Sequence, residues 1–573
     1  MRHSLSVRPP AIFAKAQPFG QDFAPTPSVT RAFVLQLALA CGGEYVSSGT
    51  GSLITKKQES RLNGLLGMNR GTRGLVRSTI SGCNGTVMKA AIGTRMTGAS
   101  NAFGWGLLNT VVSRLGTLGI GIVLARVLGP ESFGTFAVAM VALMAVLSFN
   151  ELGVSLAIVR WPEDPARIVP TVNTISVAGS TLFCTGAMVA APVFTTAMGD
   201  PGATDVVRIL ILSVFVNGIV ASPSALLQRD FREKERLWID QANVWIGAVL
   251  SVVLALTGMG AMALAAGRLA GSLVSGVMFL AASPLPYRFG LDRSLLGPLL
   301  RFGLPLAGTS VIFFAIGYAD QLTAGAVLGS TVLAFYVLAF NLSNWPVSIF
   351  AQPLRRVAPS AFSALQHNRP RMDSALEAIV VVLAAATLPV ILFVAGIAVP
   401  LVEFVYGAAW VAAATAISWL VVAASCKVFC DLVYDYLVVL GKSGTVFTVQ
   451  AGSLLVLVPA LMAGASWGGL GGLAAAQAAV TGCVVLPLYL WKLRANGLAL
   501  GGILAKIRLP FAAGLATGAA ARILAMTVTD HLAALVTAGT IAALVTAGLL
   551  YLQRDRIKEL RSIGKAATVE ATV

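Results

Sequence analysis

The sequence predicts an all-α polytopic membrane protein with about fourteen transmembrane helices. The chain is 57% hydrophobic and only 11% charged, with a mean hydropathy of +0.82, values far from those of a soluble globular domain. A hydrocarbon core of roughly 30 Å takes about 20 apolar residues per helical crossing. Residues 101–552 divide into fourteen runs of about that length, and the connections between them alternate between basic and nearly uncharged.

Each predicted helix is an apolar run bounded by polar, Gly or Pro residues. The fourteen ranges are 104–126, 133–157, 171–198, 206–227, 239–257, 261–282, 304–328, 331–354, 376–400, 410–440, 444–465, 469–491, 508–528 and 532–552.

The distribution of Lys and Arg predicts the orientation of these helices. Basic residues occur in the even-numbered connections and the C-terminal tail, whereas odd-numbered connections such as 199–205 and 257–260 contain none. Because Lys and Arg in short loops stay on the cytoplasmic side, both termini are predicted to be cytoplasmic in a bacterial inner membrane. The net charge of +17 is therefore spread over one membrane face, which favours contact with anionic lipid and argues against nucleic acid as a partner.

The chain is organised into five parts. Residues 1–100 contain 12 basic and 3 acidic residues and no spanning run, so we predict a disordered N-terminal extension, or a start codon assigned too early. Residues 101–300 and 301–492 form two predicted six-helix lobes, 493–552 an added helix pair, and 553–573 a cytoplasmic tail.

An internal repeat supports the two lobes. Val127-Leu128-Gly129 and Val327-Leu328-Gly329 end the first and seventh helices at an offset of 200 residues. Because an even number of helices separates the copies, both have the same orientation, which is the parallel type of transporter repeat.

Six basic residues lie inside predicted helices and away from the basic connections. Charge at membrane depth costs at least ~2.5 kcal/mol on insertion scales, so such residues generally face a cavity or a partner. Four lie in the first lobe, namely Arg114, Arg126, Arg208 and Arg268, and two in the remainder, Lys427 and Arg522.

The first lobe is predicted to bind an anion. Its arginines outnumber its one intramembrane acid, Glu151, and the planar guanidinium donates two hydrogen bonds at once to phosphate oxygens. Arg114 lies on a polar helix stripe, whereas Arg126 and Arg208 lie near helix ends and can also snorkel to the interface.

Carboxylates mark candidate coupling or gating groups. These are Glu151 in the first lobe, Asp320 on the seventh helix, and Asp431 and Asp435 with Lys427 on the tenth. Two structural alternatives remain open: Lys427 and Asp431 can neutralise each other, and a protonated Asp320 can form an interhelical hydrogen bond.

Enzyme and metal signatures are missing. The histidines, His3, His367 and His531, are isolated, so no metal site and no cofactor are predicted. Outer connections of about ten residues or fewer leave little room for catalytic groups. We therefore expect a transporter rather than an enzyme, and a proton or sodium ion remains open as the coupling ion.

Residues 124–134 (LARVLGPESFG) carry a recognisable signature, with further matches at 226–231 (LLQRDF) and 318–321 (YADQ). The chain resembles the polysaccharide-transporter, or oligosaccharide flippase, family of the multidrug/oligosaccharidyl-lipid/polysaccharide (MOP) exporter superfamily over roughly residues 100–500.

This resemblance implies two six-helix lobes around a central cavity that opens alternately to each side. It implies a cargo of oligosaccharide on undecaprenyl pyrophosphate, destined for exopolysaccharide, capsule or O-antigen (lipopolysaccharide), with a polysaccharide polymerase and chain-length proteins as partners. The first-lobe arginines would hold the pyrophosphate, and the added helix pair, near Arg522, would form a groove for the lipid tail. The alternative is a cation-coupled multidrug exporter of the same superfamily.

Overall fold

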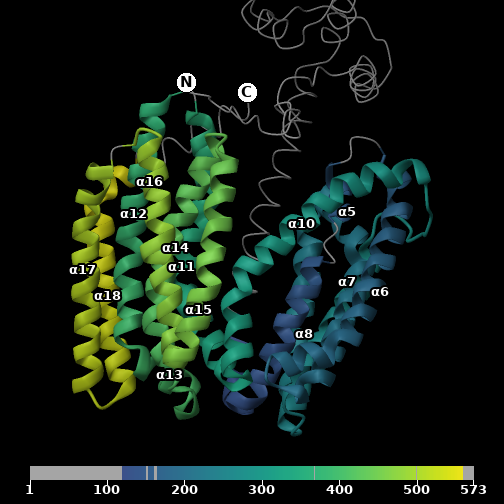
Figure 1. The fold of residues 1–573 in the computed structure, drawn as a ribbon, viewed down its shortest axis with the longest axis horizontal. Helices are drawn as coiled ribbons and strands as arrows, with labels where there is room; N and C mark the ends of the chain where they lie inside the picture. Colours follow the sequence, from purple (N-terminus) through teal and green to yellow (C-terminus); the bar gives the residue numbers. More distant parts are fainter. Residues whose placement is uncertain are drawn as a thin grey trace, which may run out of the picture. The chain divides into compact units, whose positions relative to one another are not determined.

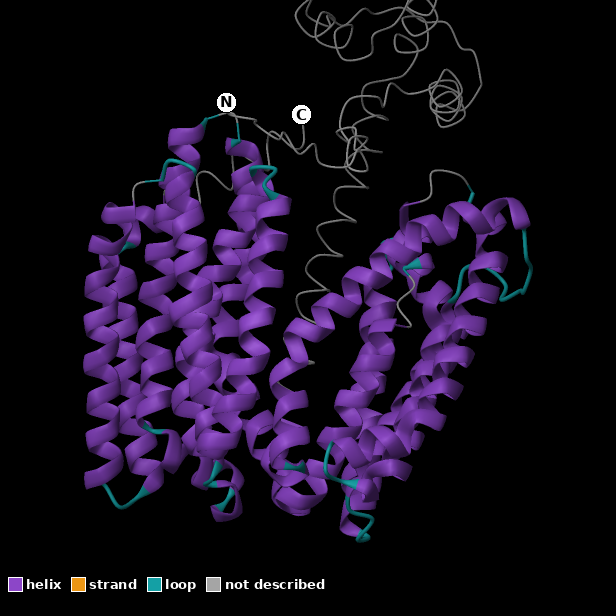
Figure 2. Cartoon of the chain, viewed as in Figure 1, coloured by secondary structure: helices purple, strands orange, loops and turns teal. Residues whose placement is uncertain are grey.

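The computed structural model describes residues 116, 119–149, 153–160, 164–366, 368–498, 500–558 and 560. Every regular element in this described part is a helix (Figure 2). Eleven helices are long and apolar enough to cross a membrane by length and composition. The predicted all-α membrane class is confirmed, whereas the number fourteen stays a prediction. The N-terminal extension, Arg114 and Glu151 lie outside the described residues.

Two continuous helical ranges each run across a predicted connection and include parts of the predicted helices on both sides of it. The segment Gly119–Phe149 includes Gly129 at φ 72°, and α15 (Ser443–Val480) includes Gly469 at φ 56°. A residue without Cβ adopts this left-handed conformation at little cost, so the chain can turn back sharply at both points. The predicted connections at 127–132 and 466–468 therefore correspond to tight turns.

The first helix group comprises the segment Gly119–Phe149 and five helices that pack on one another. They are α5 (Val154–Arg160), α6 (Pro165–Ala197), α7 (Thr204–Arg229), α8 (Glu233–Leu256) and α9 (Ala261–Ala282), with a 3₁₀ turn η1 (Pro201–Ala203) before α7. Apolar residues of Gly119–Phe149, α8 and α9 form one cluster around Leu124, Ala255 and Leu264.

The second helix group contains the later helices. They are α11 (Ser330–Leu365), α12 (Arg369–Gly396), α13 (Ala398–Tyr406), α14 (Ala413–Val439), α15, α16 (Leu486–Ala495), α17 (Leu500–Thr527) and α18 (His531–Leu552), with η3 (Ala408–Trp410) and the π-helical turn η4 (Thr481–Val485) between them. The pair α17 and α18 packs on α12 (Figure 1). Gly396 and Gly518 permit this close approach, because a Cβ on either would overlap or crowd the facing backbone.

Helix α10 (Arg293–Thr323), continued by the π-helical turn η2 (Ala324–Leu328), contacts both groups, since it packs on α5 and α6 and also on α15. It begins eleven residues before the predicted start at 304, so the predicted lobe boundary at 300 falls inside this helix. The earlier start follows from a polar cap: the Asp292 carboxylate accepts a 2.9 Å hydrogen bond from the Ser294 amide. Hydropathy detects the apolar crossing and misses such a polar first turn.

The repeated glycines have positive φ in both copies. Gly129 has φ 72° and Gly329 has φ 86°, values that favour glycine at the end of each Val-Leu-Gly sequence. The sequence repeat at an offset of 200 residues therefore marks equivalent structural positions.

Candidate functional site

A cavity of ≈ 530 Å³ lies among the helices of the first group and α10. Its lining is unusually polar for a membrane helix bundle. It contains serines from α5, α6, α7, α9 and α10, and six longer polar side chains: Asn217, Gln228, Arg236, Asp240, Asn243 and Arg268. Side chains of this kind at membrane depth generally face water or a bound molecule.

Arg268 is the cavity's basic residue in the middle of a membrane helix. It follows Gly267 on α9, and a Cβ at Gly267 would overlap Ser251 of α8. One turn later, a Cβ at Gly271 would overlap the backbone carbonyl of Asn243, which also lines the cavity. The two glycines thus let α9 lie directly against α8, and Arg268 and Asn243 reach the cavity from adjacent helices.

The ion pairs of the first group leave Arg268 available. Arg236 lies 3.8 Å from the Glu233 carboxylate one turn away on α8. Asp240, a further turn along α8, is the carboxylate on the cavity wall. Within the described part of the chain, no carboxylate lies within ion-pair distance of Arg268. A guanidinium surrounded by amide and hydroxyl groups suits an anionic ligand that also carries hydroxyls.

The other two described candidate arginines, Arg126 and Arg208, do not line this cavity. Arg126 Nε donates a 2.7 Å hydrogen bond to the Val405 carbonyl, and its Nη2 donates to the Phe404 carbonyl, both on α13. Arg208 lies 3.4 Å from Asp205 on the preceding turn of α7, where both side chains are exposed. Each arginine thus has a protein partner in the structure, and their assignment as substrate ligands stays a prediction.

Asp320 is held in an interhelical hydrogen bond. Its Oδ2 accepts a 2.8 Å bond from the Tyr336 hydroxyl of α11, and its Oδ1 accepts one of 2.8 Å from the Gln321 amide. Asp320 is 3% exposed and Tyr336 is fully buried. Asp320 thus takes part in an interhelical hydrogen bond as the acceptor, while its protonation and a coupling role stay predictions.

The remaining predicted residues lie in the second group. Lys427 approaches Asp431 to 3.4 Å along α14, the pairing expected as the structural alternative, and Asp435 lies one turn further on. Arg522 is an exposed residue of α17. No cluster of His, Cys, Asp and Glu suited to a metal ion occurs among the residues that the structure describes.

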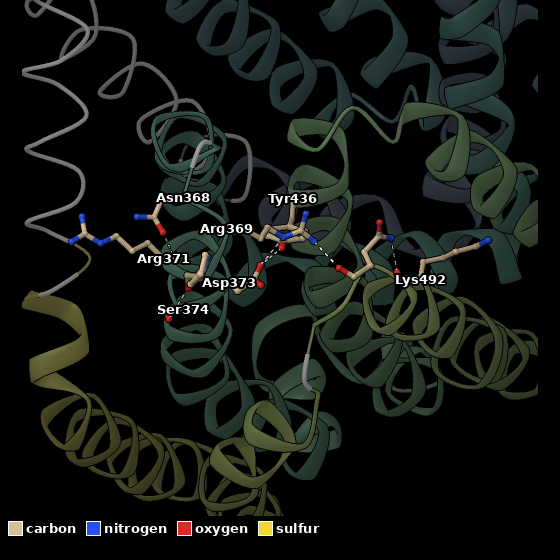
Figure 3. Close-up of polar contacts among 9 residues, drawn as sticks. Asn368, Arg369, Arg371, Asp373, Ser374, Tyr436 and Lys492 are labelled. Carbon is tan, nitrogen blue, oxygen red and sulfur yellow. Dashed lines mark hydrogen bonds and ion pairs between the residues drawn. The ribbon is translucent and has the colours of Figure 1, made fainter.

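A second polar cluster joins three helices of the second group (Figure 3). Arg369 at the start of α12 donates to Asp373 at 3.2 Å and to the Asn496 carbonyl after α16 at 2.9 Å. Tyr436 of α14 donates to the same Asp373 carboxylate, and its ring lies 5.7 Å from the Arg369 guanidinium carbon. These groups satisfy one another, so the cluster ties helices together and leaves little capacity for a ligand.

Sequence reasoning missed most of the cavity wall. Asn217, Gln228 and Asn243 are uncharged and were not proposed as ligands, while Arg236 lies in the predicted fourth connection and Asp240 lies just after it, although both belong to α8 in the structure. The sequence pattern that could have indicated the cavity lining was a polar residue on successive turns of α7 and α8. This pattern identifies the lining only when it is known which face of each helix points into the cavity.

Comparison with known proteins identifies relatives of a large part of the chain. The family described as "Polysaccharide biosynthesis protein" matches residues 123–415. The chain is 25% identical to the succinoglycan biosynthesis transport protein ExoT of Rhizobium meliloti (strain 1021) over 60% of this chain and 70% of that protein. It is 22% identical to the lipopolysaccharide biosynthesis protein WzxC of Escherichia coli (strain K12) over 64% of this chain and 75% of that protein.

Solved structures share the fold. The lipid II flippase MurJ in an inward closed conformation aligns with a TM-score of 0.64 at 14% identity, covering 78% of this chain and 99% of that one. An inward-facing multidrug resistance MATE family transporter of the MOP superfamily aligns with a TM-score of 0.54 at 18% identity, covering 67% and 95%. Since the family match spans more than half of the sequence, this multi-pass chain belongs to the polysaccharide biosynthesis protein family, and it is a membrane transporter rather than an enzyme.

Proposed function

We propose that this protein is an inner-membrane flippase, with cytoplasmic termini, that moves undecaprenyl-pyrophosphate-linked oligosaccharide across the bilayer by alternating access. The product would serve synthesis of exopolysaccharide, capsule or O-antigen, with a polymerase and chain-length proteins acting on it afterwards. The single observation that carries the proposal is the polar first-group cavity, in which Arg268 lies among Asn217, Asn243 and several serines.

The chemistry of the cavity suits the head of such a lipid. Arg268 can donate paired hydrogen bonds to phosphate oxygens, while amide and hydroxyl groups can donate to and accept from sugar hydroxyls. A volume of ≈ 530 Å³ is within the usual range for a small-molecule site, so it accommodates the pyrophosphate with the first sugars. The polyprenyl tail would remain in the bilayer, with the surface of α17 around Arg522 as a candidate groove.

Replacing Arg268 tests the proposal. We expect Arg268→Ala to abolish surface polymer and to accumulate lipid-linked oligosaccharide, measured by mass spectrometry of the lipid extract, at normal membrane abundance. Arg268→Lys keeps the charge and loses the planar fork, so intermediate export is expected. Arg301→Ala is the control, because this exposed arginine of α10 does not line the cavity. Normal export by Arg268→Ala would reject the anionic head-group site.

Asp320 is the candidate coupling or gating group, and the proposal assigns it a proton or sodium role. Asp320→Asn keeps an acceptor for the Tyr336 hydroxyl and removes the titrating carboxyl. If Asp320 couples transport to an ion gradient, the variant loses export while its thermal stability stays near wild type. Export unchanged by the substitution would leave Asp320 with a structural role alone.

A further inference from the structure

Two consecutive residues of the 124–134 signature contact the second group, one at α13 and the other at the 3₁₀ turn η3 that follows it. Arg126 donates from Nε and Nη2 to the carbonyls of Val405 and Phe404 near the end of α13. In the opposite direction, Trp410 Nε1 donates a 3.0 Å hydrogen bond to the carbonyl of Ala125. Each group thus supplies a side-chain donor to backbone carbonyls of the other group.

The C-terminus of α13 is a suitable acceptor for a cation. The last carbonyls of a helix lack intrahelical partners and carry partial negative charge. At this terminus the Gly407 amide reaches only the Glu403 carbonyl, so the next two carbonyls are those that Arg126 engages. Helix α13 is also held from the other side, because Glu403 lies 3.4 Å from His531 at the start of α18.

Tight packing surrounds the Trp410 hydrogen bond. Trp410 is 1% exposed and makes edge-on contacts with Phe133 of the first group, at 5.4 Å, and Phe335 of α11, at 5.8 Å. Close by in sequence, a Cβ at Gly134 would overlap the carbonyl of Ser330, so these two backbones touch. Water therefore has little access to the Trp410 bond, whereas the Arg126 bonds lie at the exposed edge of the contact.

All of these contacts involve the odd-numbered connections. The basic rim of the cavity, at Arg236, adjoins the fourth connection and therefore the other end of the helices. Figure 1 likewise draws α13 at the opposite end of the second group from α16, which precedes another basic connection.

We propose that the hydrogen bonds of Arg126 and Trp410 form a latch, which joins the two helix groups at the end opposite the basic rim. While these bonds are made, the cavity is closed at that end. Arg126 is a positioning residue in this proposal, since it acts through α13 and does not line the cavity. The latch rests on the proposed function, because opening at this end is the step that would release cargo to the outer leaflet.

A cysteine accessibility experiment tests the latch. Ser272→Cys, on the cavity wall, is placed in a full-length chain whose 6 native cysteines are replaced. Intact cells and inside-out vesicles are treated with a charged, membrane-impermeant methanethiosulfonate reagent, and the rate of modification is measured. Arg126→Ala is expected to raise the rate from the outer face about 5-fold to 30-fold, the shift produced by losing a contact of ordinary strength.

Matched variants separate the latch from general loosening. Trp410→Phe keeps an aromatic ring and removes the Nε1 donor, so it should also raise the rate of modification from the outer face. Arg126→Lys retains the positive charge and should raise this rate less. Arg208→Ala should leave the rate unchanged, since its ion pair stays within α7. Wild-type rates in both Arg126→Ala and Trp410→Phe, or an increase from both faces, would overturn the latch.

The readout does not depend on transport. If Arg268→Ala exports polymer normally while Arg126→Ala still accelerates labelling from one face, the head-group proposal fails and the latch stands. If Arg268→Ala blocks export and labelling is unaffected by the latch variants, the latch fails and the head-group proposal stands.

Discussion

Tyr336 of α11 donates a 2.8 Å hydrogen bond to the carboxylate of Asp320 on α10, and both side chains are buried. The bond links the helix that contacts both groups to the first helix of the second group, next to the π-helical turn Ala324–Leu328. An acidic group at membrane depth is costly unless it has such a partner. The relationship explains how Asp320 is accommodated, whatever its part in transport.

Removing the Tyr336 hydroxyl should therefore destabilise the protein. Tyr336→Phe leaves the Asp320 oxygen without this donor, at a cost of about 1 kcal/mol, typical of interhelical hydrogen bonds in membrane proteins. The measurement is the thermal unfolding midpoint in detergent. Tyr406→Phe is the control, since the Tyr406 hydroxyl makes no hydrogen bond to the described residues, and equal midpoints for the two variants would contradict the prediction.

The close approach of α8 and α9 should be sensitive to one added methyl group. A Cβ at Gly271 overlaps the Asn243 carbonyl, so Gly271→Ala must push the helices apart, with an expected cost of about 1–3 kcal/mol. Gly186→Ala on α6 is matched in chemistry but meets nothing within 4 Å, and should be neutral or slightly stabilising. Thermal unfolding of both variants checks this; the helix packing described here is wrong if Gly271→Ala is as stable as Gly186→Ala.

Gly134 provides an independent test of the contact between the helix groups. Gly134→Ala places a methyl group against the Ser330 carbonyl and should separate the two backbones. We expect faster modification of the Ser272→Cys reporter from the outer face, as for Arg126→Ala. Gly121→Ala, in the same helical segment, has nothing within 4 Å of the new Cβ and serves as control. Identical rates in both glycine variants would argue against closure at Gly134.

The cluster of Arg369, Asp373 and Tyr436 should stabilise the fold, and it should not affect export once export is normalised to protein abundance. Arg369→Ala removes donors to Asp373 and the Asn496 carbonyl, and part-buried groups left unpaired cost about 1–3 kcal/mol. We expect lower abundance and a lower unfolding midpoint, with export per molecule near wild type. The neighbouring Arg371 points away from the cluster (Figure 3), so Arg371→Ala should have neither effect. A stable Arg369→Ala protein that fails to export would instead indicate a functional site here.

The sequence by itself determined the fold class and identified several charged residues within the membrane segments. Runs of about 20 apolar residues give membrane helices because the bilayer offers the backbone no other hydrogen-bond partner. The repeat around Gly129 and Gly329 was also readable, since a left-handed turn requires glycine at both places. Arg268 was identified because an intramembrane guanidinium needs a polar environment.

Tertiary structure decided what each charged group touches. Arg126 and Arg268 are equivalent on a hydropathy plot, yet Arg126 reaches carbonyls at Phe404 and Val405, 278 and 279 residues away, while Arg268 lines a cavity. Asn217 and Asn243 carry no charge and so gave no signal until packing placed them on one wall. The free energy of inserting a charged residue depends on its type and its depth in the membrane, and both can be derived from the sequence. The groups that the residue contacts depend on how the helices pack against one another, which only the tertiary structure defines.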